Sequence, residues 1–261
     1  MSNLQLRILS GAVFGTVVLG ATWFGGWPFR VLCLVIGAGV YVEWRKITGT
    51  ASNALLVRAA ELVLIAAFAL LVAGFPPIPV FGLVFVAALL AIVAKFAGHS
   101  TGWLASGVLY AGFPAASLAF LRADHGEGFA TVMILFAIVW GTDIFAYFVG
   151  RSLGGPKLAP TISPGKTWSG AVGGTAAAVA AGLAVAAWFG PAGNPVFPLV
   201  IVLVSAWSQM GDLFESWVKR RFGVKDSGTM IPGHGGMMDR VDGLAAAASA
   251  LYVLSAAAEL L

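Results

Sequence analysis

The sequence predicts an all-α, polytopic integral membrane protein with about nine transmembrane helices and active-site loops on the cytoplasmic side. Hydrophobic residues make up 59% of its 261 residues and charged residues only 10%, which lies far outside the composition of soluble domains of this length. Apolar runs recur along the chain at close to the roughly 20 residues that cross a bilayer as a helix. The charged residues gather at the ends of these runs, as they do in membrane proteins.

Nine apolar segments are candidate transmembrane helices, separated by stretches rich in glycine, proline and polar residues. The expected spans are residues 7–25, 28–45, 54–75, 78–96, 102–122, 128–149, 168–189, 196–218 and 237–259. No small-residue cleavage site separates the first span from the second, so we expect a retained helix rather than a signal peptide. Gly170 and Gly174, like Gly11 and Gly15, have the spacing that lets two helices approach closely.

The distribution of lysine and arginine predicts the orientation of the spans. With a cytoplasmic N-terminus, Arg30 and Arg122 alone fall outside, and the other thirteen basic residues of the fifteen lie inside, as the positive-inside rule requires. Those thirteen are Arg7, Arg45, Lys46, Arg58, Lys95, Arg151, Lys157, Lys166, Lys219, Arg220, Arg221, Lys225 and Arg240. The two long polar loops, after the sixth and eighth spans, are therefore expected on the cytoplasmic side of the inner (plasma) membrane.

One polar stretch, residues 212–243, stands out in this apolar chain. It holds five of the eleven acidic residues, five of the fifteen basic residues and one of the three histidines. Five of its glycines, at positions 223, 228, 233, 235 and 236, keep the backbone out of regular helix and leave amide N–H groups for a ligand. Carboxylates, cations and bare amides together suit a phosphate substrate that carries a metal ion. A solvated loop between two helices is the plainer alternative.

Acidic residues flank this stretch in two helical stripes. Asp212, Glu215, Ser216 and Lys219 follow one face of the eighth span, and Asp239 and Asp242 repeat the i, i+3 spacing at the start of the ninth. A carboxylate inside a span costs about 2.5–3.5 kcal/mol, so an acid there is functional by default. Hard oxygen ligands favour Mg²⁺ or Mn²⁺. Salt bridges with Lys219, Arg220 or Arg240 are the alternative explanation.

A third intramembrane acid, Asp143, lies in the sixth span, and Tyr147 follows one turn later. The next loop carries Lys157 and Lys166 within a proline- and glycine-rich stretch. Its GKT string is typical of the end of a P-loop, but Pro160 stands where that motif needs its first glycine, and no strand is expected before it. We therefore interpret the segment as a basic loop suited to phosphates.

Two stretches carry a resemblance to a known family. Residues 216–242, read as S-x-x-K-R-x4-K-D-x-G-x-x-I-P-x-H-G-G-x-x-D-R-x-D, resemble the signature of the phosphatidate cytidylyltransferases, also called CDP-diacylglycerol synthases. The elements TD-x-x-AYFVGR and SP-x-KTW, from Asp143 onward, resemble the same family, although Ser169 departs from the expected Glu or Gln. Residues 1–100 resemble it in hydropathy alone. This divides the chain into an N-terminal helical part, 1–100, and a catalytic part, 101–261, with its signature at 212–243.

The resemblance implies transfer of a cytidylyl group from CTP to phosphatidate, giving CDP-diacylglycerol and pyrophosphate. It implies Mg²⁺ with a second cation, contact with membrane lipids and a homodimer. The implied metal ligands are Asp212 and Asp239. Further catalytic residues are Lys219, Lys225, Asp226, His234, Arg240 and Asp242, and substrate-binding residues are Asp143, Lys166, Ser216, Arg220, Gly235 and Gly236. No nucleic acid is expected, because the basic residues do not form one patch.

Two other functions fit parts of the pattern. An ion-coupled transporter also carries intramembrane acids, but here the acids cluster beside five basic residues and no matching halves are visible. A CDP-alcohol phosphatidyltransferase would carry D-G-x-x-A-R, whereas the residues after Asp242 and Gly243 are LAAAASA, without an arginine.

Overall fold

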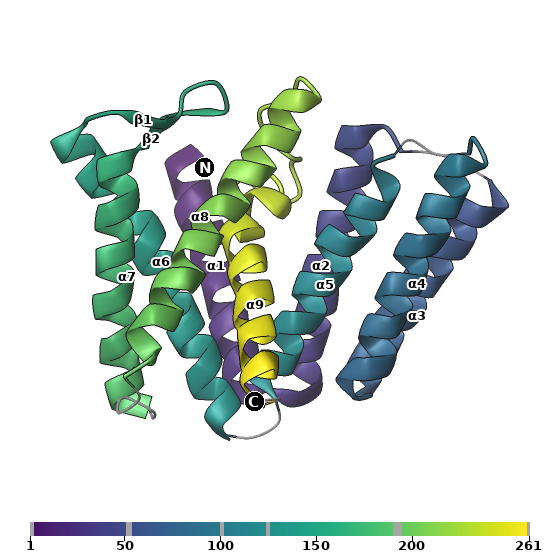
Figure 1. Cartoon of the computed structure of the whole chain (residues 1–261), viewed down its shortest axis with the longest axis horizontal. Helices are drawn as coiled ribbons and strands as arrows, with labels where there is room; N and C mark the ends of the chain where they lie inside the picture. The colour runs from purple at the N-terminus through teal and green to yellow at the C-terminus, as the bar shows by residue number, and fades with distance from the viewer. Residues whose placement is uncertain (1–2, 51–53, 100–101, 124–125, 190–194, 260–261) are drawn as a thin grey trace. The chain divides into compact units, whose positions relative to one another are not determined.

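The computed structural model describes residues 3–50, 54–99, 102–123, 126–189 and 195–259, with the side chains of 3, 4, 6, 7, 126 and 259 excepted. Helices dominate this part of the chain (Figure 1). The elements are α1 (Asn3–Phe24), α2 (Gly26–Thr48), α3 (Leu55–Ala73), α4 (Pro77–Phe96), α5 (Leu104–Arg122), α6 (Gly126–Leu153), β1 (Lys157–Ala159), β2 (Ser163–Thr167), α7 (Trp168–Phe189), α8 (Phe197–Arg221) and α9 (Met238–Glu259).

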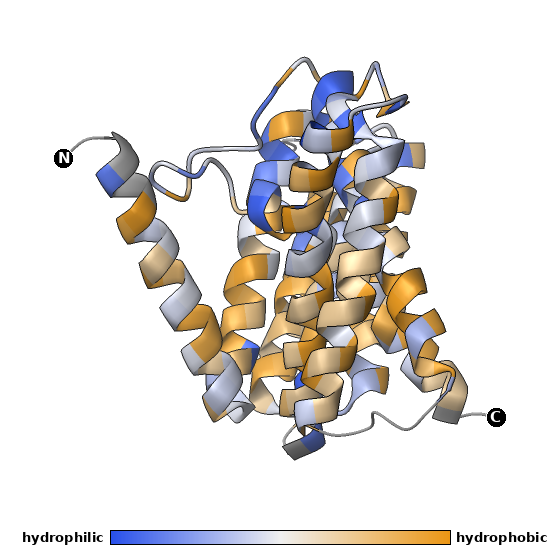
Figure 2. Cartoon of the chain, turned by 90° about the vertical axis from the view of Figure 1, so that its left-hand side faces the viewer, coloured by the Kyte–Doolittle hydropathy of each residue, from blue (hydrophilic) through white to orange (hydrophobic). Residues whose placement is uncertain are grey.

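Eight of these helices, α2 to α9, are long and apolar enough to cross a membrane. The first helix has a shorter apolar stretch, Ile8–Phe24. Hydrophobic residues cover most of the length of the helices (Figure 2). The prediction of an all-α polytopic membrane protein is therefore confirmed, and α1 as a ninth span stays a prediction. The expected turn between the seventh and eighth spans lies mostly outside the described residues, and so does the side chain of Arg7.

Turn residues define several helix ends. Gly49 follows α2 in the left-handed conformation, with φ of 63°, and its N–H bonds to Arg45 O. Gly74 ends α3 in the same way with φ of 84°, a conformation that glycine adopts without steric cost. Pro77 begins α4, where its missing N–H leaves no helical hydrogen bond unmade.

The segment after α6 departs from the expected loop. Strands β1 and β2 pair antiparallel, with Lys157 opposite Thr167 and Ala159 opposite Ser163. The hairpin turn bonds Ile162 N to Ala159 O, and Trp168 N donates to Pro156 O where α7 begins. Its glycines and prolines obscure the alternating pattern by which a strand is recognised in sequence. The two lysines of this segment therefore project from a paired scaffold.

The chain divides into two compact units. Unit 1 comprises residues 1–124 and 222–241, and unit 2 comprises residues 125–221 and 242–261. These boundaries differ from the division at residue 100, which followed the extent of the motif resemblance and stays a prediction. Residues 222–241 of the polar stretch, which include Asp239 and Arg240, belong to unit 1, whereas its residues on α8 and Asp242 belong to unit 2.

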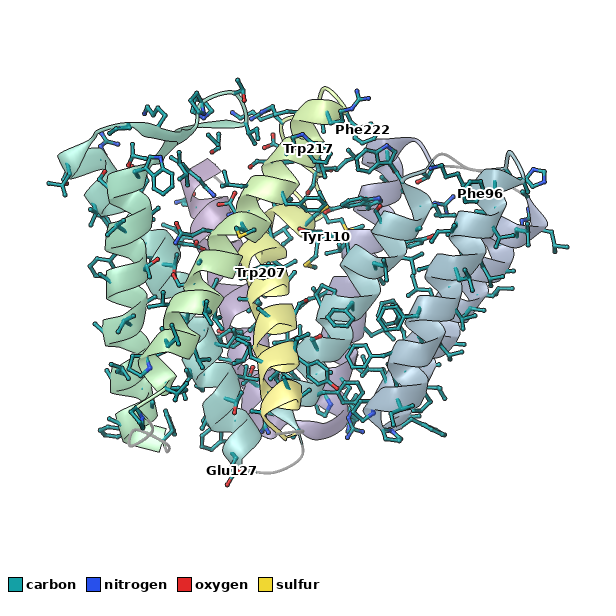
Figure 3. All side chains as sticks on the ribbon, in the orientation of Figure 1. Phe96, Tyr110, Glu127, Trp207, Trp217 and Phe222 are labelled. Atoms are coloured by element: carbon teal, nitrogen blue, oxygen red, sulfur yellow. The ribbon has the colours of Figure 1, made fainter. Side chains whose placement is uncertain are left out.

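Unit 1 has an aromatic core beside the polar loop. Trp44 of α2 is fully buried, and its Nε1 donates a hydrogen bond of 2.9 Å to Trp103 O. An added Cβ at Gly107 would overlap the Trp44 ring, so this glycine lets α5 approach α2 closely. Trp103 in turn meets Phe222 edge to face, with 5.2 Å between ring centroids, and Phe222 is labelled in Figure 3. These contacts hold the first residue of the loop against the helices.

Unit 2 depends on close packing of α6 and α7. A Cβ at Gly170 would lie 2.6 Å from Ala146 O, and one at Gly174 would lie 2.6 Å from Thr142 O. The predicted close approach at this glycine pair is therefore confirmed. The other pair behaves differently, because Gly11 faces the His234 ring and Gly15 has nothing within 4 Å of an added Cβ.

Candidate active site

Unit 2 contains a cavity of about 690 Å³ with charged residues in its wall, bounded by the C-terminal half of α6, the β-hairpin, the start of α7 and the middle of α8. Its charged and phenolic lining residues are Asp143, Tyr147, Arg151, Lys157, Lys166 and Asp212. The cavity is large enough for a small ligand by the usual range of about 300–1,000 Å³. The structure thus brings three predicted site residues, Asp143, Lys166 and Asp212, to one cavity.

Asp212 is the most connected acid of this cavity. Lys166 Nζ forms an ion pair with its Oδ2, and Ser216 Oγ lies 3.4 Å from its Oδ1, at the long end of a hydrogen bond. Asp143 and Asp242 both lie within electrostatic range of Asp212 and Lys166. Three carboxylates thus share the surroundings of one ammonium group. Their oxygen atoms are donors of the kind that a hard cation such as Mg²⁺ prefers.

A tight helix crossing in unit 2 brings Asp242 near this cluster. A Cβ at Gly211 would lie 2.8 Å from Asp242 O and would overlap the Ala246 side chain. A Cβ at Gly243 would lie 2.7 Å from Ser208 Oγ. Glycines on both helices therefore let α8 and α9 meet backbone to backbone. Asp242 Oδ1 also accepts a hydrogen bond of 2.8 Å from Gly243 N.

The other acid of the α8 stripe has a separate partner. Glu215 is 1% exposed, and its Oε2 lies 2.6 Å from Lys219 Nζ one turn further along the helix. The stripe therefore separates into Asp212, which lines the cavity, and a buried Glu215–Lys219 pair. Asp212 pairs with a lysine from the hairpin rather than with one from its own helix. Arg220 is exposed at the end of α8.

A chain of hydroxyl groups joins the helices that surround the cavity. Ser205 Oγ lies 2.8 Å from Thr142 Oγ1 and 3.1 Å from Thr175 Oγ1. Gln209 Nε2 donates to Thr175 Oγ1 at 3.0 Å and lines the cavity through its own side chain. Such interhelical bonds are the usual polar contacts of membrane bundles. They fix α6, α7 and α8 against one another.

Unit 1 carries the glycine-rich part of the signature. Ile231 and Gly235 form an isolated antiparallel bridge, and Gly235 adopts φ of 85°. His234 lies within this turn, and its Nδ1 is 2.8 Å from Ser10 Oγ of α1. Arg240 Nε donates to His234 O at 2.8 Å. The histidine is thus held on two sides, while Lys225 and Asp226 are exposed before it.

Asp239 organises the backbone of this segment. Its carboxylate accepts hydrogen bonds from Ser227 N, at 2.9 and 3.1 Å, and from Gly236 N at 2.9 Å. The amide of Gly236, expected from sequence to meet a ligand, therefore bonds within the chain in this structure. Asp239 lies in the first turn of α9, where the helix dipole favours a carboxylate.

Two residues of this network were missed by the sequence analysis. Glu43 of α2 is 1% exposed and accepts hydrogen bonds from the segment, and Ser10 of α1 contacts His234. A carboxylate inside an apolar span is a signal for Glu43, by the rule already applied to Asp212. No signal marks Ser10, because a lone serine in an apolar helix is commonplace.

The donor set fits the cation that the resemblance implies. Across the parts of the chain that the structure describes, no group of three or more His, Cys, Asp or Glu side chains is placed to hold a metal ion. Mg²⁺, however, is usually held by one or two carboxylates together with substrate phosphates. Asp212, paired with an ammonium beside two further acids, offers carboxylate oxygens of that kind.

Fold and site together define a polytopic membrane protein with a cavity of carboxylates and basic groups, which is the chemistry of a phosphate-handling enzyme. The chain matches the model of the Cytidylyltransferase family over residues 5–258 and belongs to that family. The match extends the resemblance across the N-terminal helices, where hydropathy alone had indicated it. It also decides against the transporter and the CDP-alcohol phosphatidyltransferase alternatives.

Several relatives are similar over nearly the whole chain. A phosphatidate cytidylyltransferase of Brucella abortus biovar 1 (strain 9-941) is 49% identical over 264 residues, covering 98% of this chain and 94% of the relative. One from Brucella melitensis biotype 1 is 48% identical with the same coverage. A third, from Rickettsia bellii, is 33% identical over 97% of this chain and 91% of the relative.

Proposed function

We propose that this protein transfers a cytidylyl group from CTP to phosphatidate, with CDP-diacylglycerol and pyrophosphate as products. The proposal is supported by family membership and by the relatives named for this activity. The observation that carries it in the structure is the cavity in which Lys166 and Asp212 pair, with Asp143 beside them. A phosphate oxygen of the lipid attacks the α-phosphorus of CTP, and the bond from that phosphorus to the pyrophosphate oxygen breaks.

This reaction needs positioning rather than a strong base, because the attacking phosphate is already an oxyanion. The difficulty is to bring two polyanions together, and basic side chains reduce their repulsion. Lys166, Lys157 and Arg151 line the cavity in unit 2 and are placed to contact phosphate oxygens. Ser216 and Arg220 on α8 are proposed to contribute further substrate contacts.

Asp212 and Asp239 are the proposed ligands of Mg²⁺, with a second cation of unassigned identity. When bound, the metal would neutralise phosphate charge and orient the triphosphate. Asp212 would exchange its Lys166 partner for the cation, which frees the lysine for a substrate phosphate. Asp239 would keep its backbone hydrogen bonds while it binds the metal, because a carboxylate has about four acceptor positions and the hydrogen bonds do not occupy all of them.

The glycine-rich segment of unit 1 is proposed to bind substrate phosphates. Lys225 and Arg240 are exposed and cationic, and His234 is oriented through its Nδ1 contact with Ser10. In that orientation Nε2 is the ring nitrogen left for a ligand. We assign His234 a binding role ahead of proton donation to pyrophosphate.

We propose further that the protein lies in the bacterial inner membrane with these residues on the cytoplasmic side, where CTP is available. The basic residues of the β-hairpin and of the end of α8 support this orientation. Phosphatidate would enter sideways from the bilayer. The homodimer that the resemblance implies remains part of the proposal.

The location of the radioactive label tests the reaction directly. Purified protein in detergent, given phosphatidate and CTP labelled at the α-phosphorus, should move label into the organic phase as CDP-diacylglycerol. With CTP labelled at the γ-phosphorus, the label should appear in pyrophosphate and none in lipid. Label from the γ-position in lipid would identify a kinase, and no transfer by folded protein would reject the proposal.

A further inference from the structure

A buried carboxylate on α2 holds both ends of the glycine-rich segment of unit 1. Glu43 Oε1 accepts a hydrogen bond of 2.9 Å from Met237 N, and Oε2 accepts one of 2.8 Å from Met238 N. Ser227 Oγ donates to Oε2 at 3.0 Å. Ser227 stands at the beginning of the segment and the two methionines at its end. One side chain therefore holds both ends of a loop of about ten residues. The loop residues that it contacts lie 184 to 195 positions away from Glu43 in the sequence.

These contacts form an anion-binding site in which the bound anion is a carboxylate of the protein itself. All three neighbours are donors, and an ionised carboxylate accepts only, so each contact is charge-assisted. Met238 begins α9, and a helix N-terminus favours negative charge. An acid that is 1% exposed requires such partners, because an unpaired buried charge would be strongly destabilising.

Two glycines of the signature are explained by the space that this carboxylate occupies. A Cβ at Gly228 would lie 2.6 Å from Glu43 Oε1. A Cβ at Gly236 would lie 2.6 Å from Glu43 Oε2 and would overlap Ser227 Oγ. Neither glycine has positive φ, so conformational freedom does not account for them. Close approach to Glu43 does, which is a second and independent indication that the segment is built around this side chain.

Asp239 completes the arrangement from within the segment. It binds Ser227 N and Gly236 N, and Ser227 Oγ accepts a hydrogen bond of 3.3 Å from Asp239 N. Ser227 therefore links the two acids. Removing Glu43 leaves Asp239 as the remaining carboxylate that holds Ser227 and Gly236. Asp239 would then have to hold the loop and meet a cation at once.

We propose that Glu43 is a positioning residue of the active site, which fixes the phosphate-binding segment and leaves Asp239 oriented for its ligand. The proposal rests on the function proposed above for this segment. It assigns Glu43 no contact with substrate. Its effect passes through Ser227, Met237 and Met238, and so through the geometry of His234 and Asp239.

The test uses the full-length protein in detergent with the variant Glu43→Gln, the conservative variant Glu43→Asp and the control Glu61→Gln. Glu61 is an acid of the same unit that pairs with Arg45 and accepts a hydrogen bond from Tyr41 Oη. Hydrogen exchange of the Met237 and Met238 amides and steady-state kinetics for CTP are measured together. Thermal unfolding and exchange in α3 and α4 report the integrity of the helices.

We expect Glu43→Gln to speed exchange at Met237 and Met238 by about tenfold or more, because a hydrogen bond to an ionised group is typically worth a factor of ten. kcat/KM should fall by about tenfold or more, with α3 and α4 still protected. Glu43→Asp should be intermediate, and Glu61→Gln should match the wild type in both readouts. Should Glu43→Gln not fold, Ser227→Ala gives the milder form of the same test, with a smaller change in the same direction.

Unchanged exchange at the two methionines, or faster exchange without loss of activity, would overturn the proposal. So would an equal loss in the Glu61→Gln control, which would show a general cost of removing an acid from unit 1. A wild type that forms no CDP-diacylglycerol would reject the proposed function instead. The exchange measurement would then still decide whether Glu43 holds the segment.

Discussion

Lys166 of β2 and Asp212 of α8 form an ion pair at the wall of the cavity in unit 2. Their side chains are 27% and 32% exposed, so both remain accessible to a ligand. The carboxyl groups of Asp143 and Asp242 lie within electrostatic range of this pair. A cation that binds Asp212 and a phosphate that binds Lys166 would separate the pair, and each would favour the binding of the other.

Removal of the Lys166 ammonium tests its part in this coupling. Lys166→Met should lower kcat/KM by about a hundredfold, the scale on which a charge-stabilising donor acts. Lys166→Arg should retain part of the activity, because it keeps the charge but changes the geometry. The control is Lys95→Met, at an exposed lysine at the end of α4. Equal kinetics for the two Met variants would remove Lys166 from the site.

Close helix packing in unit 2 gives a prediction about stability. Gly174→Ala places a Cβ 2.6 Å from Thr142 O, a backbone atom that cannot move alone, whereas Gly141→Ala meets nothing closer than 3.5 Å. We expect Gly174→Ala to destabilise the protein by about 1–3 kcal/mol, as overpacking does. Gly141→Ala should be neutral or slightly stabilising, since alanine favours helix. Thermal unfolding in detergent measures both, and a reversed order would contradict the α6–α7 contact.

The chain of hydroxyl groups in unit 2 should contribute less to the stability of the protein than its number of hydrogen bonds suggests. Ser205→Ala removes contacts with Thr142 and Thr175, and interhelical hydrogen bonds in membranes average about 0.6 kcal/mol. The expected loss of stability is about 1 kcal/mol, below that of Gly174→Ala. A larger loss of stability, measured in the same unfolding experiment, would mean that these hydroxyl groups are required for folding of unit 2.

Membrane orientation can be tested with single cysteines. Cys33 is fully buried, so a thiol reagent should leave it unlabelled. Two exposed positions can carry a new cysteine, Thr161→Cys in the hairpin and Glu127→Cys at the start of α6. Glu127 is labelled in Figure 3. An impermeant maleimide should label Glu127→Cys in spheroplasts. It should reach Thr161→Cys only after the membrane is permeabilised. The opposite pattern would place the cavity on the outer side.

Much of the fold could be predicted because membrane helices are encoded locally. The apolar runs matched the helices to within a few residues, and the Gly170–Gly174 spacing correctly indicated the close α6–α7 contact. The β-hairpin was missed because prolines and glycines mask its alternation, and because its stability comes from pairing between strands rather than from either strand alone.

The residues of the candidate site could be predicted only where they lie in one continuous stretch of the sequence. Residues 212–243 carry their charges in an apolar chain, and so drew attention to Asp212 and Asp239. Glu43 and Ser10 act through contacts with residues about 184 to 224 positions away. An acid inside an apolar span was a local signal for Glu43, but no local pattern reveals its partners or marks Ser10. Lys166 as the partner of Asp212 was not foreseen either, because it comes from the folded hairpin, whereas the alternative considered from sequence was a salt bridge with Lys219, Arg220 or Arg240.

The most direct test is the Mg²⁺ dependence of CDP-diacylglycerol formation by the wild type, Asp212→Asn and Asp239→Asn. We predict that the wild type forms product only with Mg²⁺, and that both substitutions abolish formation while the proteins stay folded. Metal-independent activity, or full activity of either folded variant, would contradict it.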